Sequence, residues 1–491
     1  MDEEEKLPKR QLILVGIAVL LTGILLIVKP SHSVFQVNKT INIMDAKVGN
    51  FKREASGWVK SGTVGGGDAV TVDLVTGMIP VIWGEDVDTN WYNYNSFKWA
   101  NAVLVSDANR TYYQNAEPGT VIYEDDILAY FVYIPRYRYQ LWNANNGVSS
   151  VQTINIEFEN KATTPVCGGN TCTTNRIYST GTNGQMLTHP AFTFGTTELN
   201  GIWVGKFETS GYTTDVTTAT CMSAPSASTC NNTNMIPVIK PNVSALRYQT
   251  FTNEYGTAIK FKSNVMYGIN NSTIDSHMMK NMEWGAVAYL SQSIYGKKGN
   301  QGTEIWINNY NVGSGSYYNT LTGCSAASVS ASSSTSCTYP YPNSSGVEAS
   351  TTGTLYGIYD MSGGALEYVM GNMAASGQTP PANINPLSSG FTSPYPNNKY
   401  YDSYLYGTTN NDATAFARGY LGDGTKETLT CLNSTNCAWY SDISAFVYSS
   451  FAWFCRGGDW DDALGAGVGF FYFSTGLLSL NVGFRVTLVV E

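Results

Sequence analysis

Charged side chains are scarce in this chain of 491 residues. Only 13% of the residues are Asp, Glu, Lys or Arg, against about 25% in ordinary soluble proteins. Their place is taken by 48 glycines, 33 tyrosines and many Ser, Thr and Asn, a composition common on extracytoplasmic surfaces. The net charge is −9, whereas binding to nucleic acid requires a basic stripe, which the sequence lacks. We therefore exclude nucleic acid as a partner.

Histidine and catalytic motifs are also scarce. His32, His189 and His277 are the only histidines, and we interpret His189, which precedes a proline, as a structural hydrogen-bonding residue. The sequence contains no Gly-x-Ser-x-Gly elbow, His-Glu-x-x-His pair or phosphate-binding loop. No two cysteines have the Cys-x-x-Cys spacing of a zinc site. These absences disfavour hydrolases, zinc enzymes and nucleotide-binding proteins.

One long uncharged apolar run is present near the N-terminus, at residues 11–28. It is long enough to cross a bilayer as a helix. Lys6, Lys9 and Arg10 precede it, so the basic flank is expected on the cytoplasmic side and the rest of the chain outside. We expect an uncleaved single-pass anchor in the cell membrane. The alternative is a cleaved signal peptide, which would make the protein secreted.

Eight of the nine cysteines fall into close pairs, each around a loop rich in Ser, Thr, Asn or Gly. Beside an export segment, such pairing predicts disulfides formed in an oxidising compartment. The leftover Cys455 is expected to be a buried small apolar residue. The predicted disulfides are Cys167–Cys172, Cys221–Cys230, Cys324–Cys337 and Cys431–Cys437.

The remaining chain is long enough for several domains or for one large domain with insertions. Residues 1–30 form the cytoplasmic tip and anchor, 31–77 are expected to be a stalk, and 78–126 a small β-rich module. From residue 127 buried strands alternate with long polar insertions. Few helices are expected: one at 243–251, capped by Asn242, and one from Asp275 to Leu290 with an apolar face.

Several short motifs then occur in the order found in the formylglycine-generating-enzyme-like (sulfatase-modifying factor) variant of the C-type lectin fold. The resemblance spans residues 127–491. It implies an α+β domain with few helices, antiparallel sheet and long loops, behind the N-terminal transmembrane helix and the small β-rich segment. The motifs are His189-Pro190-Ala191-Phe192, Trp203 to Glu208, Glu283-Trp284, Tyr359 to Tyr368, Arg456-Gly457-Gly458 and Gly483-Phe484-Arg485.

Departures from that family argue against its enzymatic activity. Catalytic members hold a copper-binding cysteine pair just after the Gly-Gly motif, where this chain has Asp459 to Leu464, and copper chemistry of that kind needs two thiolates. The family's calcium motif retains Glu367 but has glycine at 364 in place of asparagine. Glu367 is therefore only a weak calcium candidate, and no other metal, cofactor or catalytic residue is predicted.

The closing segment is similar to the variable region of surface proteins diversified by retroelements. In these proteins a fixed frame surrounds exchangeable positions, and segment 459–480 of this chain corresponds to the variable part. The resemblance implies scaffold roles for Arg456, Gly457, Gly458, Trp460, Gly483, Phe484 and Arg485. It implies ligand-binding roles for Asp459, Asp461, Asp462, Leu464, Gly465, Tyr472, Phe473, Ser474, Thr475, Leu477 and Ser479.

We therefore predict a non-catalytic, membrane-anchored bacterial or prophage receptor or adhesin. Its unknown ligand is expected to be a protein, on another cell or a host, because exposed aromatic residues dominate binding energy. Two alternatives stay open at this point. One is an oxidoreductase of the formylglycine-generating or sulfoxide-synthase type. The other is a structural protein of the cell envelope in which residues 461–480 are packed core.

Overall fold

The computed structural model describes most of the chain after its first 45 residues. The described residues are 46–49, 52–54, 57–59, 62–63, 70, 72–84, 91–145, 150–168, 178–213, 220–269, 272–313, 320–407 and 413–491. They belong to one compact unit that begins at Ile43. Within it, more residues lie in strands than in helices.

The largest element is a seven-stranded sheet in which all neighbours are antiparallel. Its C-terminal strand lies inside the sheet, between two strands that are more than seventy residues apart in sequence. In spatial order the strands are β1 (Lys47–Val48), β5 (Ile79–Ile82), β7 (Asn101–Val105), β8 (Ile127–Pro135), β14 (Gly201–Gly205), β25 (Val486–Val490) and β17 (Ile274–Met278).

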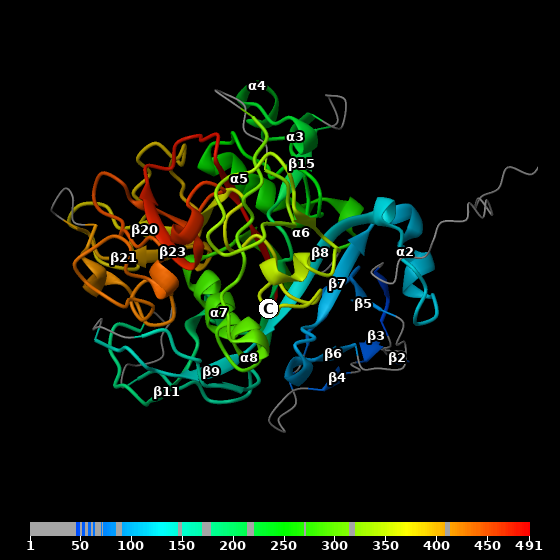
Figure 1. Cartoon of the computed structure of the whole chain (residues 1–491), viewed down its shortest axis with the longest axis horizontal. Coiled ribbons are helices and arrows are strands. Elements are labelled where there is room, and N and C mark those ends of the chain that lie inside the picture. The colour runs from blue at the N-terminus through cyan, green and yellow to red at the C-terminus, as the bar shows by residue number, and fades with distance from the viewer. Residues whose placement is uncertain are drawn as a thin grey trace, which may run out of the picture. The chain divides into compact units, whose positions relative to one another are not determined.

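A second, five-stranded sheet contains most of the closing segment. Its antiparallel strands are β20, β22 and β23, while β21 and β24 pair with β20 in parallel. The two sheets lie on opposite sides of helix α7 in Figure 1. The strands are β20 (Leu366–Met373), β21 (Asp402–Tyr404), β22 (Trp453–Gly457), β23 (Gly467–Ser474) and β24 (Val482–Phe484).

Smaller sheets complete the unit. One has three strands, β10 (Ile156–Phe158), β9 (Tyr137–Gln140) and β11 (Met186–Thr188). The two-stranded pairs are β2 (Lys52–Glu54) with β3 (Gly57–Val59), β4 (Gly62–Thr63) with β6 (Tyr92–Asn93), β12 (Thr193–Phe194) with β13 (Thr197–Glu198), β15 (Ser210–Tyr212) with β16 (Ile236–Val238), and β18 (Cys324–Ser325) with β19 (Tyr339–Pro340).

The described helices are short. The α-helices are α2 (Asp107–Gln114), α3 (Thr220–Ser223), α4 (Ala227–Cys230), α5 (Phe251–Ala258), α6 (Lys260–Ser263), α7 (Asn281–Ser291) and α8 (Lys297–Gln301). Single 3₁₀ turns are η1 (Tyr94–Ser96), η2 (Glu124–Asp126), η3 (Pro190–Phe192), η4 (Val265–Tyr267), η5 (Gly346–Ala349), η6 (Asn398–Tyr400), η7 (Phe416–Arg418), η8 (Trp439–Ser441) and η9 (Ala463–Gly465).

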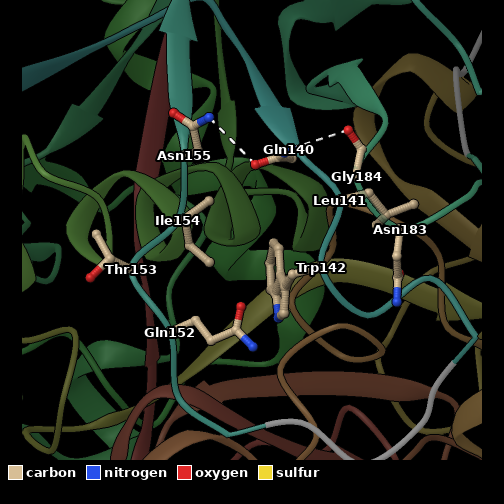
Figure 2. A pocket seen from close by; sticks show the side chains of 9 residues that line it. All are labelled: Gln140, Leu141, Trp142, Gln152, Thr153, Ile154, Asn155, Asn183 and Gly184. Atoms are coloured by element: carbon tan, nitrogen blue, oxygen red, sulfur yellow. Dashed lines mark hydrogen bonds between the residues drawn. The ribbon is translucent and has the colours of Figure 1, made fainter.

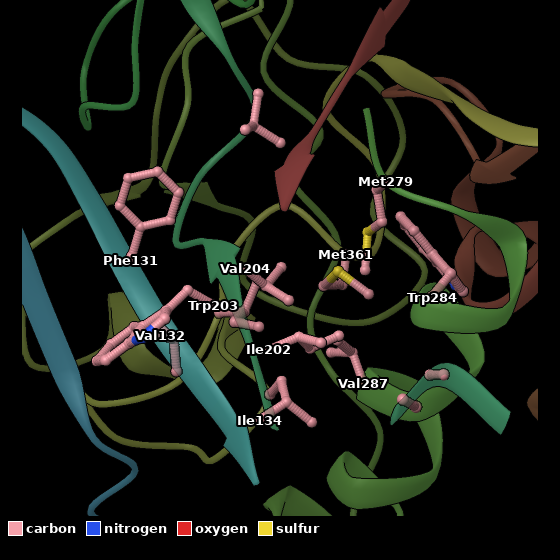
Figure 3. Close-up of a cluster of buried hydrophobic side chains, with 14 of the residues drawn as sticks. Phe131, Val132, Ile134, Ile202, Trp203, Val204, Met279, Trp284, Val287 and Met361 are labelled. Atoms are coloured by element: carbon pink, nitrogen blue, oxygen red, sulfur yellow. The ribbon is translucent and has the colours of Figure 1, made fainter. Parts of the chain in front are cut away.

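Helix α7 is the centre of the core, and all of its residues are buried. It contacts β8 of the seven-stranded sheet and β20 of the five-stranded sheet. At its start, the Glu283 carboxylate accepts the backbone N–H of Lys280 at 2.9 Å, so a first-turn donor is satisfied inside the protein. Figure 3 shows side chains from α7, β8 and β14 in this core: Trp284, Val287, Phe131, Val132, Ile134, Ile202, Trp203 and Val204.

The predicted fold class requires a correction. Among the described residues no helix is both long and apolar enough to span a bilayer. The predicted fold class, which included a transmembrane helix, is therefore wrong for the described part of the chain. That part is mainly sheet. Residues 11–28, where the helix was expected, lie outside the described residues.

The predicted boundary at residue 126 runs through a single sheet. Strands β5 and β7, from the expected small module, pair with each other, and β7 pairs with β8 from the expected lectin-like domain. Ala102 and Phe131 are register partners and both are completely buried. Because these strands share one sheet and one core, residues 78–105 belong to the same packed unit as the residues that follow.

Both predicted helices were misplaced. Residues 243–250 are irregular, Asn242 has a positive φ of 59°, and the helix begins only at Phe251, with Thr250 as its cap. Residues 275–278 form part of β17, paired with β25, and α7 begins at Asn281. In the second case a strand partner from the end of the chain decides the local conformation.

Three of the predicted disulfides are confirmed. The Cα–Cα distances are 5.7 Å for Cys221–Cys230, 5.6 Å for Cys324–Cys337 and 4.9 Å for Cys431–Cys437, within the range that a disulfide spans. The fourth prediction involves Cys172, which lies outside the described residues. Cys455 is a free, buried cysteine, as expected.

Candidate functional site

The first group of scaffold residues, Arg456-Gly457-Gly458, anchors strand β22 in the core. Arg456 is fully buried, and its Nη1 donates to Asn281 Oδ1 and to the carbonyl of Asp423, each at 3.0 Å. Its guanidinium carbon lies 5.6 Å from the centre of the Trp284 ring. Burial lowers the pKa of Arg456 to about 10, so the side chain remains a cation at neutral pH. Arg456 thus connects β22 to α7 and cannot face a ligand.

Glycine is required after this arginine because the chain turns sharply beside packed atoms. Gly457 and Gly458 have φ values of 84° and 76°, which favour glycine. A Cβ on Gly458 would lie 2.7 Å from that of Ala466. The following Trp460 is buried, and its backbone N–H donates to the carbonyl of Gly364 at 3.1 Å.

The second group of scaffold residues, Gly483-Phe484-Arg485, joins the two large sheets. Arg485 lies between β24 and β25 and donates through Nε and Nη2 to the two carboxylate oxygens of Glu367 on β20. Its Nη1 also donates to the carbonyl of Gly205 on β14 at 2.8 Å. Both charged side chains are completely buried. This bidentate pair holds the strands on either side of the closing segment together.

The calcium candidate Glu367 is therefore already engaged. Both of its carboxylate oxygens accept hydrogen bonds from Arg485. At the family's asparagine position, a Cβ on Gly364 would lie 2.4 Å from Oε1 of Glu208, so a second carboxylate fills the room of the missing side chain. The weak calcium candidate at Glu367 stays a prediction, and the hydrogen bonds from Arg485 to both carboxylate oxygens disfavour it.

The acidic residues that follow Gly458 form a turn that is held by hydrogen bonds among themselves. Oδ2 of Asp462 accepts the N–H of Asp459 at 2.8 Å, and Oδ1 of Asp459 accepts the N–H of Asp461 at 2.9 Å. Asn481 donates to Asp459 Oδ2 at 3.0 Å and links this turn to the end of the segment. Partial burial, then the neighbouring carboxylates, raise the pKa of Asp462 to about 6. The turn is thus ordered and acidic, and we call Asp459, Asp461 and Asp462 the acidic rim.

Strand β23 passes from the core to the surface towards its C-terminal end. Phe470 and Phe471 are buried, whereas Tyr472 is 38% exposed. Phe473 is half-buried, and its ring stacks on that of Tyr472 with centroids 4.4 Å apart. Phe470 and Phe471 therefore pack inward, against the core. An aromatic pair is thereby left at the surface end of the strand.

The return loop from Thr475 to Asn481 is held by its backbone. The carbonyl of Thr475 accepts from Ser388 N at 3.1 Å, and that of Ser479 accepts from Tyr248 N at 2.9 Å. The hydroxyl of Tyr368 donates to the carbonyl of Leu477 at 2.9 Å, while the Leu477 side chain is 56% exposed. Main-chain groups thus hold the loop and leave the Leu477 side chain exposed.

The predicted scaffold residues and the predicted ligand-binding residues thus differ in burial. All seven predicted scaffold residues are buried, and none of the predicted ligand-binding residues is. We call the latter set the display surface: Asp459, Asp461, Asp462, Leu464, Gly465, Tyr472, Phe473, Ser474, Thr475, Leu477 and Ser479.

The structure adds three neighbours that sequence reasoning missed. Phe473 lies 4.8 Å from Tyr448 and 5.1 Å from Phe451, measured between ring centroids. Tyr448 and Phe451 bond to each other's backbone across a Ser-Ser turn, and two aromatics around such a turn are a sequence signal for a hairpin end. Leu387 is 39% exposed, next to the Ser388 that contacts the return loop. No local signal marks Leu387.

Within the described residues, His189, His277 and the free Cys455 have internal roles. His277 Nε2 lies 2.9 Å from Glu283 Oε1, and His189 Nδ1 accepts the N–H of Ala191 at 3.2 Å, as a structural residue would. Burial lowers the pKa of His189 to about 3, and burial raises the pKa of the Cys455 thiol well above its ordinary value. Among the described residues no three His, Cys, Asp or Glu side chains are grouped to hold a metal ion.

Comparison with known proteins gives this chain no family. No protein-family model matches it, and no curated protein sequence matches it.

Proposed function

We propose that this protein is an exported, non-catalytic ligand-binding protein that presents the display surface to a protein partner. The observation that carries the proposal is the contrast in burial between the seven scaffold residues, all buried, and the residues of the display surface, none of which is buried. A buried frame with accessible intervening side chains tolerates sequence change without loss of the fold, because exposed substitutions cost little stability. We further propose that the domain is a variant of the C-type lectin fold.

Two features support a protein partner, and a third supports export. Leu464, Tyr472 and Leu477 expose 47%, 38% and 56% of their surface, and large apolar or aromatic side chains at the surface supply contact area with few torsions to restrict. The acidic rim places charge at the edge of this surface, as in protein interfaces. The three disulfides support a location in an oxidising compartment.

The described cysteine side chains give little support to the alternative that the protein is an oxidoreductase. A copper site of the family's type needs two accessible thiolates, whereas Cys455 is buried and burial raises the pKa of its thiol. The six cysteines of the described disulfides are engaged with one another. Non-catalytic binding is therefore the function that we propose.

The proposal is tested by exchanging the display surface as a set. A library randomised at its positions should fold, with most members losing less than about 1 kcal/mol of stability, and selection against a purified protein such as lysozyme should yield binders. The matched control randomises the seven frame positions and should destroy folding, since large-to-small changes in a core cost about 2–5 kcal/mol. Equal damage from both libraries would refute the display role.

A second test separates binding from packing within the natural sequence. Serine in place of Tyr472, Phe473 and Leu477 should leave the melting temperature within a few degrees of the parent, because Tyr472 and Leu477 are 38% and 56% exposed. The control Trp460→Ser removes a buried frame residue and should lower it much more. A collapse of the triple variant would support the alternative in which residues 461–480 are packed core.

A further inference from the structure

A polar pocket is lined by residues that are not part of the display surface. Its volume is about 300 Å³, and it is lined by the end of β9, the segment 152–155 and the turn at 183–184. Figure 2 shows Trp142 in its middle, between Gln152 and Ile154 on one side and Asn183 on the other. None of the residues named below belongs to the display surface.

The lining of the pocket combines one large aromatic ring with side-chain amides. Four lining residues are Gln140, Gln152, Asn155 and Asn183, and none of the nine lining residues carries a charge. Each amide offers both donors and an acceptor. A sugar hydroxyl is likewise both donor and acceptor, so a row of amides matches adjacent hydroxyls. The absence of charge in the lining disfavours phosphate, carboxylate and cationic ligands, whose burial requires a counter-charge.

The ring of Trp142 is held rigidly. One side stacks on Trp439 with an interplanar angle of 27° and a centroid distance of 5.8 Å. The ring of Tyr289 packs against it edge-on at 4.9 Å. A preorganised aromatic ring suits the weakly apolar face of a sugar ring, because little side-chain entropy is lost on binding.

The amides are also positioned before any ligand arrives. Gln140 Nε2 donates to the carbonyl of Gly184 at 3.2 Å, and its Oε1 accepts from Asn155 Nδ2 at 3.5 Å. Asn183 Oδ1 accepts the backbone N–H of Ala144 at 2.7 Å. These bonds use only part of the hydrogen-bonding capacity of the amides.

From this arrangement we infer that the pocket binds a single ring of a neutral saccharide. The volume is at the small end of the range for ligand sites, which fits a single ring. The lining is too polar for an apolar ligand of that size. Because these residues are separate from the display surface, the protein would have two binding sites of different chemistry.

The inference is tested by saturation-transfer NMR with the full chain. The probes are methyl glucoside, methyl galactoside and methyl N-acetylglucosaminide, with glucuronate as the charged comparison, each at about 10 mM to reveal affinities near the millimolar range. At least one neutral glycoside should receive saturation, and glucuronate should receive less. Absence of signal for all three neutral probes, or a stronger signal for glucuronate, would overturn the inference.

Variants then locate the binding. Gln152→Ala and Asn155→Ala alter exposed side chains, so both should fold, and each should weaken glycoside binding about five- to tenfold through lost hydrogen bonds. The matched control is Gln378→Ala, an exposed glutamine that does not line the pocket, which should bind as the parent does. Unchanged binding in both pocket variants would place the sugar elsewhere and contradict the inference.

Discussion

At the scale of single residues, the Arg485–Glu367 pair joins the two sheets. Replacing Arg485 by Met should cost about 3–5 kcal/mol, because it leaves the Glu367 carboxylate buried without its partner. It also removes a donor from the carbonyl of Gly205. Chemical denaturation measures the change in the free energy of unfolding.

The control for this prediction is another arginine–glutamate pair. Arg138 and Glu157 are 39% and 49% exposed, so Arg138→Met should cost less than about 1 kcal/mol. Similar losses for the two arginine variants would mean that the buried pair has no special role in joining the sheets.

At the scale of elements, α7 fits its surroundings without spare room. A Cβ on Gly285 would lie 1.9 Å from the carbonyl oxygen of Gly422. Gly285→Ala should therefore destabilise the protein by about 2 kcal/mol or more, since overpacked cores must shift their backbone. Thermal unfolding followed by circular dichroism measures the effect.

The control for Gly285→Ala is a glycine in helix α5. Gly256 is exposed, and no atom lies within 4 Å of where its Cβ would be. Gly256→Ala should stabilise the protein by about 0.5–1 kcal/mol, because alanine has the higher helix propensity. If Gly285→Ala were as well tolerated as Gly256→Ala, the close contact between α7 and Gly422 would be refuted.

At the scale of the whole molecule, buried carboxyl groups make stability depend on pH. Glu427 is completely buried, and burial raises its pKa from 4.5 to about 8. Between these values the folded protein keeps a proton that the unfolded chain releases. The contribution of Glu427 to stability is thus complete below pH 4.5 and is lost as the pH rises through about 8.

Glu427→Gln should flatten this dependence. The amide is neutral at every pH and can still accept from Tyr289, whose hydroxyl lies 2.6 Å from Glu427 Oε2. The free energy of unfolding, measured at about pH 5 and about pH 8, should differ less in the variant than in the parent. Curves that stay parallel would show that Glu427 is not the titrating group.

Local sequence determined the features that depend on short spacing or on residue type. The cysteine pairs at 221/230, 324/337 and 431/437 were predicted because each closes a short polar loop. The display surface itself remains a prediction, which the burial contrast supports.

Only the tertiary structure decided where strands find their partners. Residues 275–278 read as the start of a helix, yet β25, more than two hundred residues later, pairs with them as a strand. Glu367 read as a calcium ligand until Arg485 came within hydrogen-bond distance. Likewise Trp142 and Asn183 meet only because separate loops converge on one pocket. Sequence patterns report local propensity, whereas long-range pairing, burial and charge neutralisation depend on which distant residues share a core.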